Sequence, residues 1–173
     1  LQYLKEISKR YGSKEFLILT YTPNEGMVSD NSINNLLSLK YKIQSLDWVY
    51  SVITLLDIPL LNSSDAPLQD RLQNFKTLKD EEINRERGFN EIVSSPVFRN
   101  FVISEDGKTS GIIVNFKKDS QLKDISNKSK KEIEAHKDLI KKQNHQNILE
   151  IRDVIKSYED IGKIHLGGIP MIA

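Results

Sequence analysis

The chain has 173 residues, of which 28% are charged and 38% are hydrophobic, a composition typical of a soluble globular domain with a proper core. Its 25 basic and 24 acidic side chains leave a formal net charge of +1, so the charge balance gives no sign of binding to nucleic acid or to an anionic membrane surface. The absence of cysteine excludes disulfides, thiolate catalysis and cysteine-ligated metals.

No apolar run reaches the roughly 18 residues that a membrane-spanning helix needs, and no signal peptide is visible. The chain begins without an initiator methionine and ends just after an apolar stretch. We therefore expect it to be a piece of a longer protein. We predict a single domain over residues 1–173, with a core over about 13–61 and 95–173 and an insertion over about 62–94.

The first two elements are predicted from short apolar patterns. Leu1, Leu4 and Ile7 recur at helical spacing and predict a short amphipathic helix over residues 1–11. The run EFLILTYT, residues 15–22, is apolar and β-branched, and it predicts a strand that is buried on both faces. The sequence Pro-Asn-Glu-Gly follows and ends this strand.

A helix and a second strand are predicted next. Ser29, Asp30 or Asn31 can cap the helix at its start. Its apolar stripe consists of Ile33, Leu36, Leu37, Ile43 and Leu46. The run WVYSVITLLDIPLL, residues 48–61, predicts the second strand, which Pro59 brings towards its end. Residues 62–88 are polar and lack a steady period, so we expect an inserted loop with one or two short helices.

The stretch SPVFRNFVISEDGKTSGIIVNF, residues 95–116, contains Gly-Lys-Thr and raises the question of a phosphate-binding loop. Such a loop needs a glycine five residues before Gly107, where this chain has Val102, and it needs a helix afterwards. A β-branched apolar run follows instead. The strand-like runs on both sides and the dipeptide Asp106-Gly107 predict a β-hairpin with a tight type I′ turn.

A long helix and a last strand complete the pattern. Residues 126–160 predict one helix with two apolar patches, and the polar stretch KKQNHQN between the patches is expected to be exposed or to break the helix. The final strand is KIHLGGIPMIA, residues 163–173, in which Gly167-Gly168 and Pro170 mark a bend or bulge. Without the insertion, the order is strand, helix, strand, strand, helix, strand. This order predicts an α+β fold of the ferredoxin-like split βαβ plan (βαββαβ), with an inserted, partly helical loop.

Few residues are candidates for chemistry. His136 and His145 are nine residues apart, on opposite faces of one predicted helix, and His165 falls in a strand, so we expect no metal site. The acidic cluster KDEEINRER, residues 79–87, could supply carboxylates for acid–base work, but its interleaved basic residues favour a solvated helix face with i, i+4 pairs. Trp48 could stack on a ligand, although a core position at a strand edge is the default. We therefore predict no enzyme activity and no catalytic, cofactor-binding or metal-binding residues, and no substrate-binding residue is identified.

Four stretches occur in an ordered set, namely YGSKEFLILTYTP, LDWVYSVITLLDIPLL, SSPVFRNFVISEDGKTSGIIVNF and IHLGGIPMIA. In this order they resemble the first large extracytoplasmic loop of the resistance-nodulation-division transporters. The most similar branch includes the mycobacterial "membrane protein large" proteins, the hopanoid exporters and the "predicted exporters". Residues 62–88 and the KKQNHQN stretch have no counterpart in that pattern.

The resemblance implies a periplasmic porter domain with a ferredoxin-like core, in a loop of a bacterial inner-membrane protein. It implies that the domain forms part of the passage for hydrophobic or lipid-like cargo, together with the matching loop from the second half of the transporter. Proton coupling would belong to transmembrane helices outside this chain, so no cofactor and no catalytic turnover are implied. The implied partners are the cargo, the rest of the transporter and, in an oligomer, further copies of it, with no nucleic acid.

Two other interpretations stay open. An extracytoplasmic ligand-sensing domain of a membrane-bound signalling protein would also lie between membrane helices, and residues 126–160 could serve as its dimerisation helix, although they lack a sustained heptad. A cytoplasmic ferredoxin-like enzyme or regulatory domain would need a phosphate loop, a metal site or a catalytic pair. All three proteins would share a fold class, so the fold alone does not decide between them.

Overall fold

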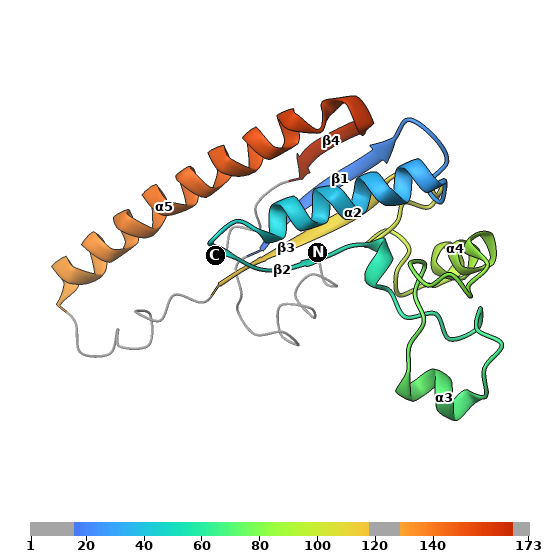
Figure 1. Cartoon of the computed structure of the whole chain (residues 1–173). Coiled ribbons are helices and arrows are strands. Elements are labelled where there is room, and N and C mark those ends of the chain that lie inside the picture. Colours follow the sequence, from blue (N-terminus) through green and yellow to red (C-terminus); the bar gives the residue numbers. More distant parts are fainter. Residues whose placement is uncertain (1–15, 118–128, 168–173) are drawn as a thin grey trace.

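The computed structural model describes residues 16–117 and 129–167. Its centre is a four-stranded sheet in the order β2-β3-β1-β4, in which each neighbouring pair is antiparallel (Figure 1). The strands are β1 (Phe16–Pro23), β2 (Val49–Ile53), β3 (Ser110–Phe116) and β4 (Gly162–Gly167). The helices are α2 (Asp30–Gln44), α3 (Leu68–Gln73), α4 (Arg85–Ser94) and α5 (Lys130–Ser157), with short 3₁₀ turns η1 (Leu55–Asp57) and η3 (Glu159–Ile161). This arrangement confirms the predicted α+β class.

The central strand β1 confirms the predicted strand but not its burial on both faces. Side chains alternate along a strand, and in β1 the alternation separates a fully buried face from a half-buried one. Leu17, Leu19 and Tyr21 are fully buried. In the neighbouring strand β3, Ile112 pairs with Leu19 and Val114 pairs with Leu17 on the same buried face. The main core therefore lies on one side of the sheet.

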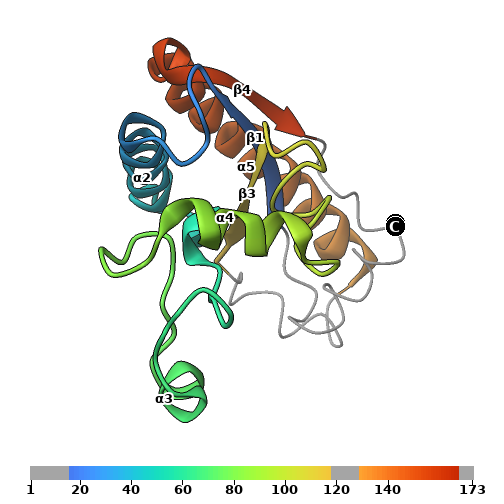
Figure 2. The same ribbon diagram turned by 90° about the vertical axis from the view of Figure 1, so that its right-hand side faces the viewer.

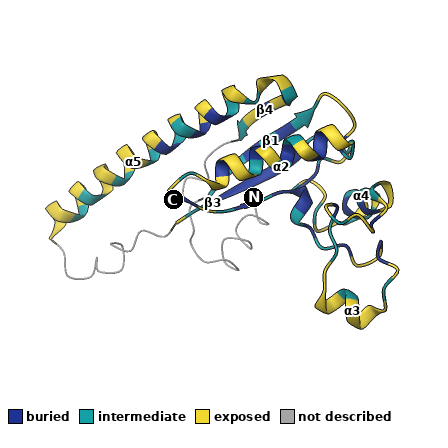
Figure 3. Cartoon of the chain, viewed as in Figure 1, coloured by how far each residue is buried: buried dark blue, intermediate teal, exposed yellow. Residues whose placement is uncertain are grey.

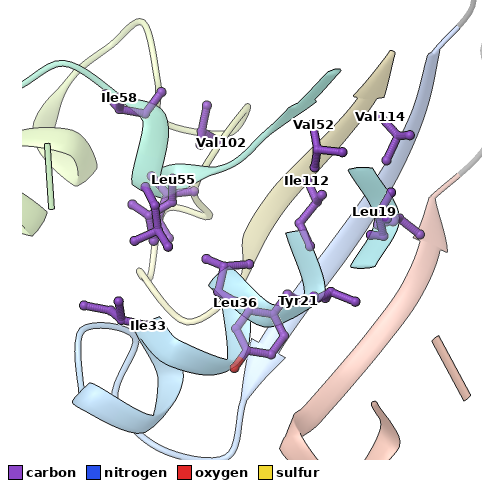
Figure 4. Packing of buried hydrophobic residues seen from close by; sticks show 14 of the residues in the cluster. Leu19, Tyr21, Ile33, Leu36, Val52, Leu55, Ile58, Val102, Ile112 and Val114 are labelled. Atoms are coloured by element: carbon purple, nitrogen blue, oxygen red, sulfur yellow. The ribbon is translucent and has the colours of Figure 1, made fainter. Parts of the chain in front are cut away.

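Helix α2 covers this buried face (Figure 4). Ser29 is its N-cap, as the sequence allowed, and its hydroxyl oxygen accepts the Ser32 backbone N–H at 3.1 Å. The buried apolar stripe of the helix differs from the predicted one, because Leu39 is fully buried whereas Leu37 and Leu46 are only partly buried. The observed stripe follows strict helical spacing and consists of Ile33, Leu36, Leu39 and Ile43.

The second strand is shorter than predicted. It ends at Ile53, and the chain turns at once into η1. The reason is a capping box: the Thr54 hydroxyl accepts the Leu56 N–H at 3.1 Å, and the Asp57 carboxylate accepts the Thr54 N–H at 2.8 Å. Leu55 and Leu56, which were predicted to belong to the strand, are fully buried within this turn.

The structure has a turn at the predicted place, but the predicted turn type and the predicted first strand of the hairpin are wrong. The Gly107 N–H donates to the Ser104 carbonyl at 2.9 Å, and the Ser104 N–H donates to the Thr109 carbonyl at 2.8 Å. Gly107 has φ 71°, but Asp106 is not in the positive-φ region that a type I′ turn requires at both central residues. The first arm forms only isolated bridges instead of a strand, because the Phe98 carbonyl accepts the Val102 N–H at 2.9 Å in a helix-like turn.

Helix α5 is continuous over 28 residues and does not break at the polar KKQNHQN stretch. It starts at a capping box formed by Ser129 and Glu132. Its C-terminal part packs beside α2, and its N-terminal part extends beyond the sheet, where most of its surface is exposed (Figures 1 and 3). Among the described residues, no helix combines the length and the apolar character needed to cross a bilayer.

The insertion holds the two short helices α3 and α4, as predicted, and lies at one end of the sheet (Figure 2). The acidic segment 79–84 is not a helix, because it forms turns in which the Asp80 carboxylate accepts the Thr77 N–H at 2.7 Å. The predicted helix over 1–11 and the features at Gly168 and Pro170 lie outside the described residues.

Candidate functional site

A cavity of about 440 Å³ opens where β1 ends, between the loop after β1, helix α4 and the turn before β3. Its volume is within the range of about 300–1,000 Å³ that is typical of small-molecule sites. The lining residues are Thr22, Pro23, Glu25, Gly26, Met27, Val28, Glu86, Phe89, Gly107 and Lys108. No single stretch of sequence supplies this pocket, because its walls come from three separate segments.

The first wall is the loop that follows β1. Pro23 ends the strand, and the Gly26 carbonyl accepts the Ser29 N–H at 3.0 Å, so the loop turns tightly into the N-terminus of α2. Met27 in this loop is only 6% exposed and belongs to the main core. Its side chain and that of Val28 therefore give the pocket an apolar floor that is continuous with the core.

The second wall is helix α4. Asn84 caps this helix by accepting the Arg87 N–H at 3.0 Å. Gly88 allows the helix to lie close to the segment just before the insertion, since a Cβ there would be 2.8 Å from Leu60 Cδ1. The next residue, Phe89, is half-buried and lines the pocket. It lies against Gly107, where a Cβ would be 3.1 Å from Phe89 Cζ.

The third wall is the turn before β3. The Asp106 carboxylate accepts the Ser104 hydroxyl at 2.6 Å and the Lys108 N–H at 3.0 Å, and these bonds lower the pKa of Asp106. The hydroxyl groups of Thr109 and Thr22 are 2.8 Å apart, which ties the turn to the end of β1. These two contacts fix the backbone of the turn at Lys108, whose side chain is exposed.

The rim carries two carboxylates and one ammonium group, from Glu25, Glu86 and Lys108. All three residues are exposed, and the Glu25 carboxylate accepts a hydrogen bond from Asn31 Nδ2 at 3.0 Å. Among the described residues that line the pocket, no nucleophile lies beside a general base.

Tyr21 precedes the lining residues Thr22 and Pro23 in β1, and among the described residues its buried hydroxyl has no hydrogen-bond partner. Burial raises the pKa of Tyr21, and the nearby Glu25 carboxylate adds to this rise, whereas interaction with the Ser32 hydroxyl opposes it. Its phenol is therefore neutral, and as a core residue it supports β1 instead of lining the pocket.

The residues singled out from the sequence lie elsewhere. His136 and His145 stay on opposite faces of the unbroken helix α5, and His165 is exposed on β4. In the part of the chain that the structure describes, no group of three or more His, Asp or Glu side chains could hold a metal ion. Trp48 takes a structural position, since its ring makes an edge contact with Phe116 at a centroid distance of 5.0 Å.

The acidic cluster forms exposed ion pairs within the insertion. Lys76 Nζ is 3.2 Å from Glu82 and 3.9 Å from Asp80, but Lys76 precedes the cluster and residues 79–84 are not helical, so these are not the predicted pairs along a helix face. No site chemistry results from these exposed pairs. The pocket itself was missed from the sequence, because only the breaker residues around Gly26 and the turn at Gly107 mark its position.

No family model matches this chain, and no curated protein or solved structure is significantly similar to it.

Proposed function

We propose that this chain is a periplasmic porter domain of a resistance-nodulation-division exporter, and that it forms part of the passage for hydrophobic or lipid-like cargo. The observation that carries the proposal is the sheet. The order β2-β3-β1-β4, with antiparallel neighbours and a helix between β1 and β2 and between β3 and β4, supports the ferredoxin-like plan that the resemblance implies.

The positions of the four ordered sequence stretches also support the proposal. The first stretch contributes β1 and the third contributes β3, and these two strands pair along the centre of the sheet. The second contributes β2 and η1, and the fourth begins in β4 at the edge. Each stretch that carries the resemblance therefore includes one strand of the sheet, whereas residues 62–88, which have no counterpart, lie in the insertion outside it.

Such a porter domain would bind cargo and move during transport, and it would catalyse no reaction. The domain would contact the matching periplasmic loop of the second transporter half and line a path for cargo. Proton coupling would stay in the membrane helices. The pocket at the end of β1 offers an apolar surface of the kind that such cargo requires.

The sensor interpretation is favoured by one observation, the unbroken 28-residue helix α5, whose N-terminal part extends beyond the sheet (Figure 1). Helices of this kind can pair in sensor dimers. The two functions predict different phenotypes, so a single genetic experiment separates them.

The experiment is deletion of the parent gene in its own host, followed by lipid analysis of the separated inner and outer membranes. We expect an amphiphile to accumulate in the inner membrane, and we expect the intact gene to restore its distribution. A version of the gene that lacks only the segment encoding this domain should not restore it. An unchanged lipid distribution, together with loss of a transcriptional response, would support the sensor and contradict the exporter.

A further inference from the structure

The pocket at the end of β1 has a charge pattern that selects among possible ligands. Its floor is apolar, with side chains of Met27, Val28 and Phe89. Its rim has two carboxylates, Glu25 and Glu86, against one ammonium group. A ligand that fits both features has an apolar body and a positive charge.

The carboxylate of Glu86 is free of the basic residues next to it in sequence. Arg85 forms an ion pair with Asp30, at the start of α2. Arg87 Nη1 is 3.2 Å from Asp65, and its Nη2 donates to the Asn62 carbonyl at 2.9 Å. Both guanidinium groups are thus engaged elsewhere, and the negative charge of Glu86 stays available at the rim.

Glu25 is oriented but not neutralised. Asn31 Nδ2 donates to its Oε1 at 3.0 Å, and within the described residues it forms no ion pair with a lysine or arginine. The one basic residue on the rim, Lys108, lies near Asp106, whose pKa its charge helps to lower. The local balance at the rim is therefore negative.

Phe89 is the aromatic residue of the same pocket. Its ring is half-buried and lies against Gly107, where a Cβ would be 3.1 Å from Phe89 Cζ, and both residues line the pocket. The face of an aromatic ring attracts cations through its quadrupole, in particular ammonium groups that carry methyl groups.

We propose that this pocket binds an organic cation with an apolar body, of the alkylammonium class, with the body against Met27, Val28 and Phe89 and the charged nitrogen beside Glu25 and Glu86. This binding does not depend on the exporter proposal. Only the further step of regarding the cation as transported cargo depends on it. An anionic amphiphile would meet two carboxylates at the rim, and a neutral one would make no use of them.

The test measures binding of matched amphiphiles to the chain by two-dimensional NMR, below their micelle concentrations. The probes are decyltrimethylammonium, decyl sulfate and decyl glucoside, which share one tail and differ in head-group charge. The amide signals of Gly26 and Gly107 report on the pocket, because both residues line it. We expect decyltrimethylammonium to shift these signals and to bind more tightly than the other two probes.

Charge variants then test the role of the rim. The double variant Glu25→Gln, Glu86→Gln should bind decyltrimethylammonium about three- to tenfold more weakly, because each exposed carboxylate contributes a modest attraction. Lys108→Gln should bind it more tightly. The matched control Glu81→Gln, Glu105→Gln removes two exposed carboxylates that do not line the pocket and should bind like the wild type.

The inference is overturned if decyl sulfate or decyl glucoside binds as tightly as the cation. It is also overturned if the double variant at Glu25 and Glu86 keeps full affinity while its melting temperature matches the wild type. Cation binding in the absence of any transport phenotype would leave the pocket inference in place and remove the exporter proposal.

Discussion

Trp48 donates its indole Nε1–H to the Glu150 carboxylate at 2.8 Å, and this hydrogen bond joins the start of β2 to helix α5. The two residues are far apart in the sequence, and both are half-buried. The Trp48 carbonyl also accepts the Lys117 N–H at 2.9 Å. Trp48 thus connects the β2 edge of the sheet, the end of β3 and the long helix.

We predict that Glu150→Ala destabilises the chain by about 1 kcal/mol, since it leaves a half-buried donor without its charged acceptor. Asp153→Ala is the matched control, because Asp153 is exposed on the same helix and should change stability by less than about 0.5 kcal/mol. Urea unfolding, followed by Trp48 fluorescence, measures both variants with the only tryptophan in the chain. Equal stability of the two variants would show that the Trp48–Glu150 bond is not a structural link.

Asp57 joins three segments of the chain. Its Oδ1 is 2.5 Å from Lys40 Nζ in α2 and 3.5 Å from Lys79 Nζ in the insertion, and its Oδ2 accepts the Thr54 N–H. We expect Asp57→Ala to destabilise by about 2–3 kcal/mol, because Lys40 would stay largely buried without its partner. The control is Asp65→Ala, which removes an exposed ion pair and should cost no more than about 1 kcal/mol. A small effect at Asp57 would contradict this role.

Glu91 holds the start of the insertion against α4. Its Oε1 accepts the N–H groups of Leu61 at 2.8 Å and Asn62 at 3.0 Å, and its Oε2 accepts the Ser63 hydroxyl at 2.6 Å. Glu91→Ala should cost about 1–3 kcal/mol and should speed amide hydrogen exchange at Leu61 and Asn62. Asn90→Ala, at an exposed position beside it, should leave exchange at these two amides unchanged. Unchanged exchange at these two amides in the Glu91 variant would show that Glu91 does not hold the start of the insertion against α4.

The loss of stability at low pH should depend on the carboxylates of Asp57 and Glu91. Burial alone would raise the pKa of Asp57, but Lys40, the Thr54 N–H and Lys79 outweigh it and lower the pKa. At Glu91, burial alone would also raise the pKa. Hydrogen bonds from the 61–63 segment outweigh burial, so the pKa of Glu91 is lowered as well. Their contribution is full above the ordinary carboxyl pKa of about 4 and is lost as the pH falls through the lower folded values.

The measurement is the free energy of unfolding as a function of pH. We expect stability to fall as the pH decreases from about 5, and we expect the double variant Asp57→Asn, Glu91→Gln to show a flatter decline. An equally steep decline in the double variant would assign acid sensitivity to other groups.

Gly111 lets the 98–104 segment lie directly on β3. A Cβ at this position would be 2.6 Å from the Phe101 carbonyl oxygen, which is backbone and cannot rotate away. Gly111→Ala should therefore destabilise by about 1–3 kcal/mol. Gly26→Ala is the control, since a Cβ there meets nothing within 4 Å, and it should be neutral in a thermal melt. Wild-type stability of the Gly111 variant would contradict the close approach.

The elements that could be predicted from the sequence are those fixed by local signals. The run that forms β1 has a strand composition and a following breaker, and Ser29 caps α2 through its own side chain. These signals act within a few residues, so the rest of the fold does not override them. The helix continues through KKQNHQN, where most residues are exposed and the buried Asn147 accepts a hydrogen bond from Gln143 Nε2 at 3.0 Å.

The sequence-based predictions are wrong where non-local or competing interactions determine the local structure. Thr54 and Asp57 form a capping box inside a run that is otherwise typical of a strand. Val102 and Ile103 have strand propensity, but the segment is held by the Phe98 carbonyl and by contact with Gly111. The pocket forms where three segments that are distant in the sequence come together, and no spacing along the chain predicts that they do.

The most direct test of the exporter proposal is the sequence of the parent gene on both sides of the segment that encodes this chain. The proposal predicts a hydrophobic span directly before the chain, another directly after it, and many further spans with a second domain of this fold in the other half. One or two spans followed by a cytoplasmic signalling module would contradict it and would make this chain a sensor domain. Flanks without any hydrophobic span would contradict both the exporter and the sensor.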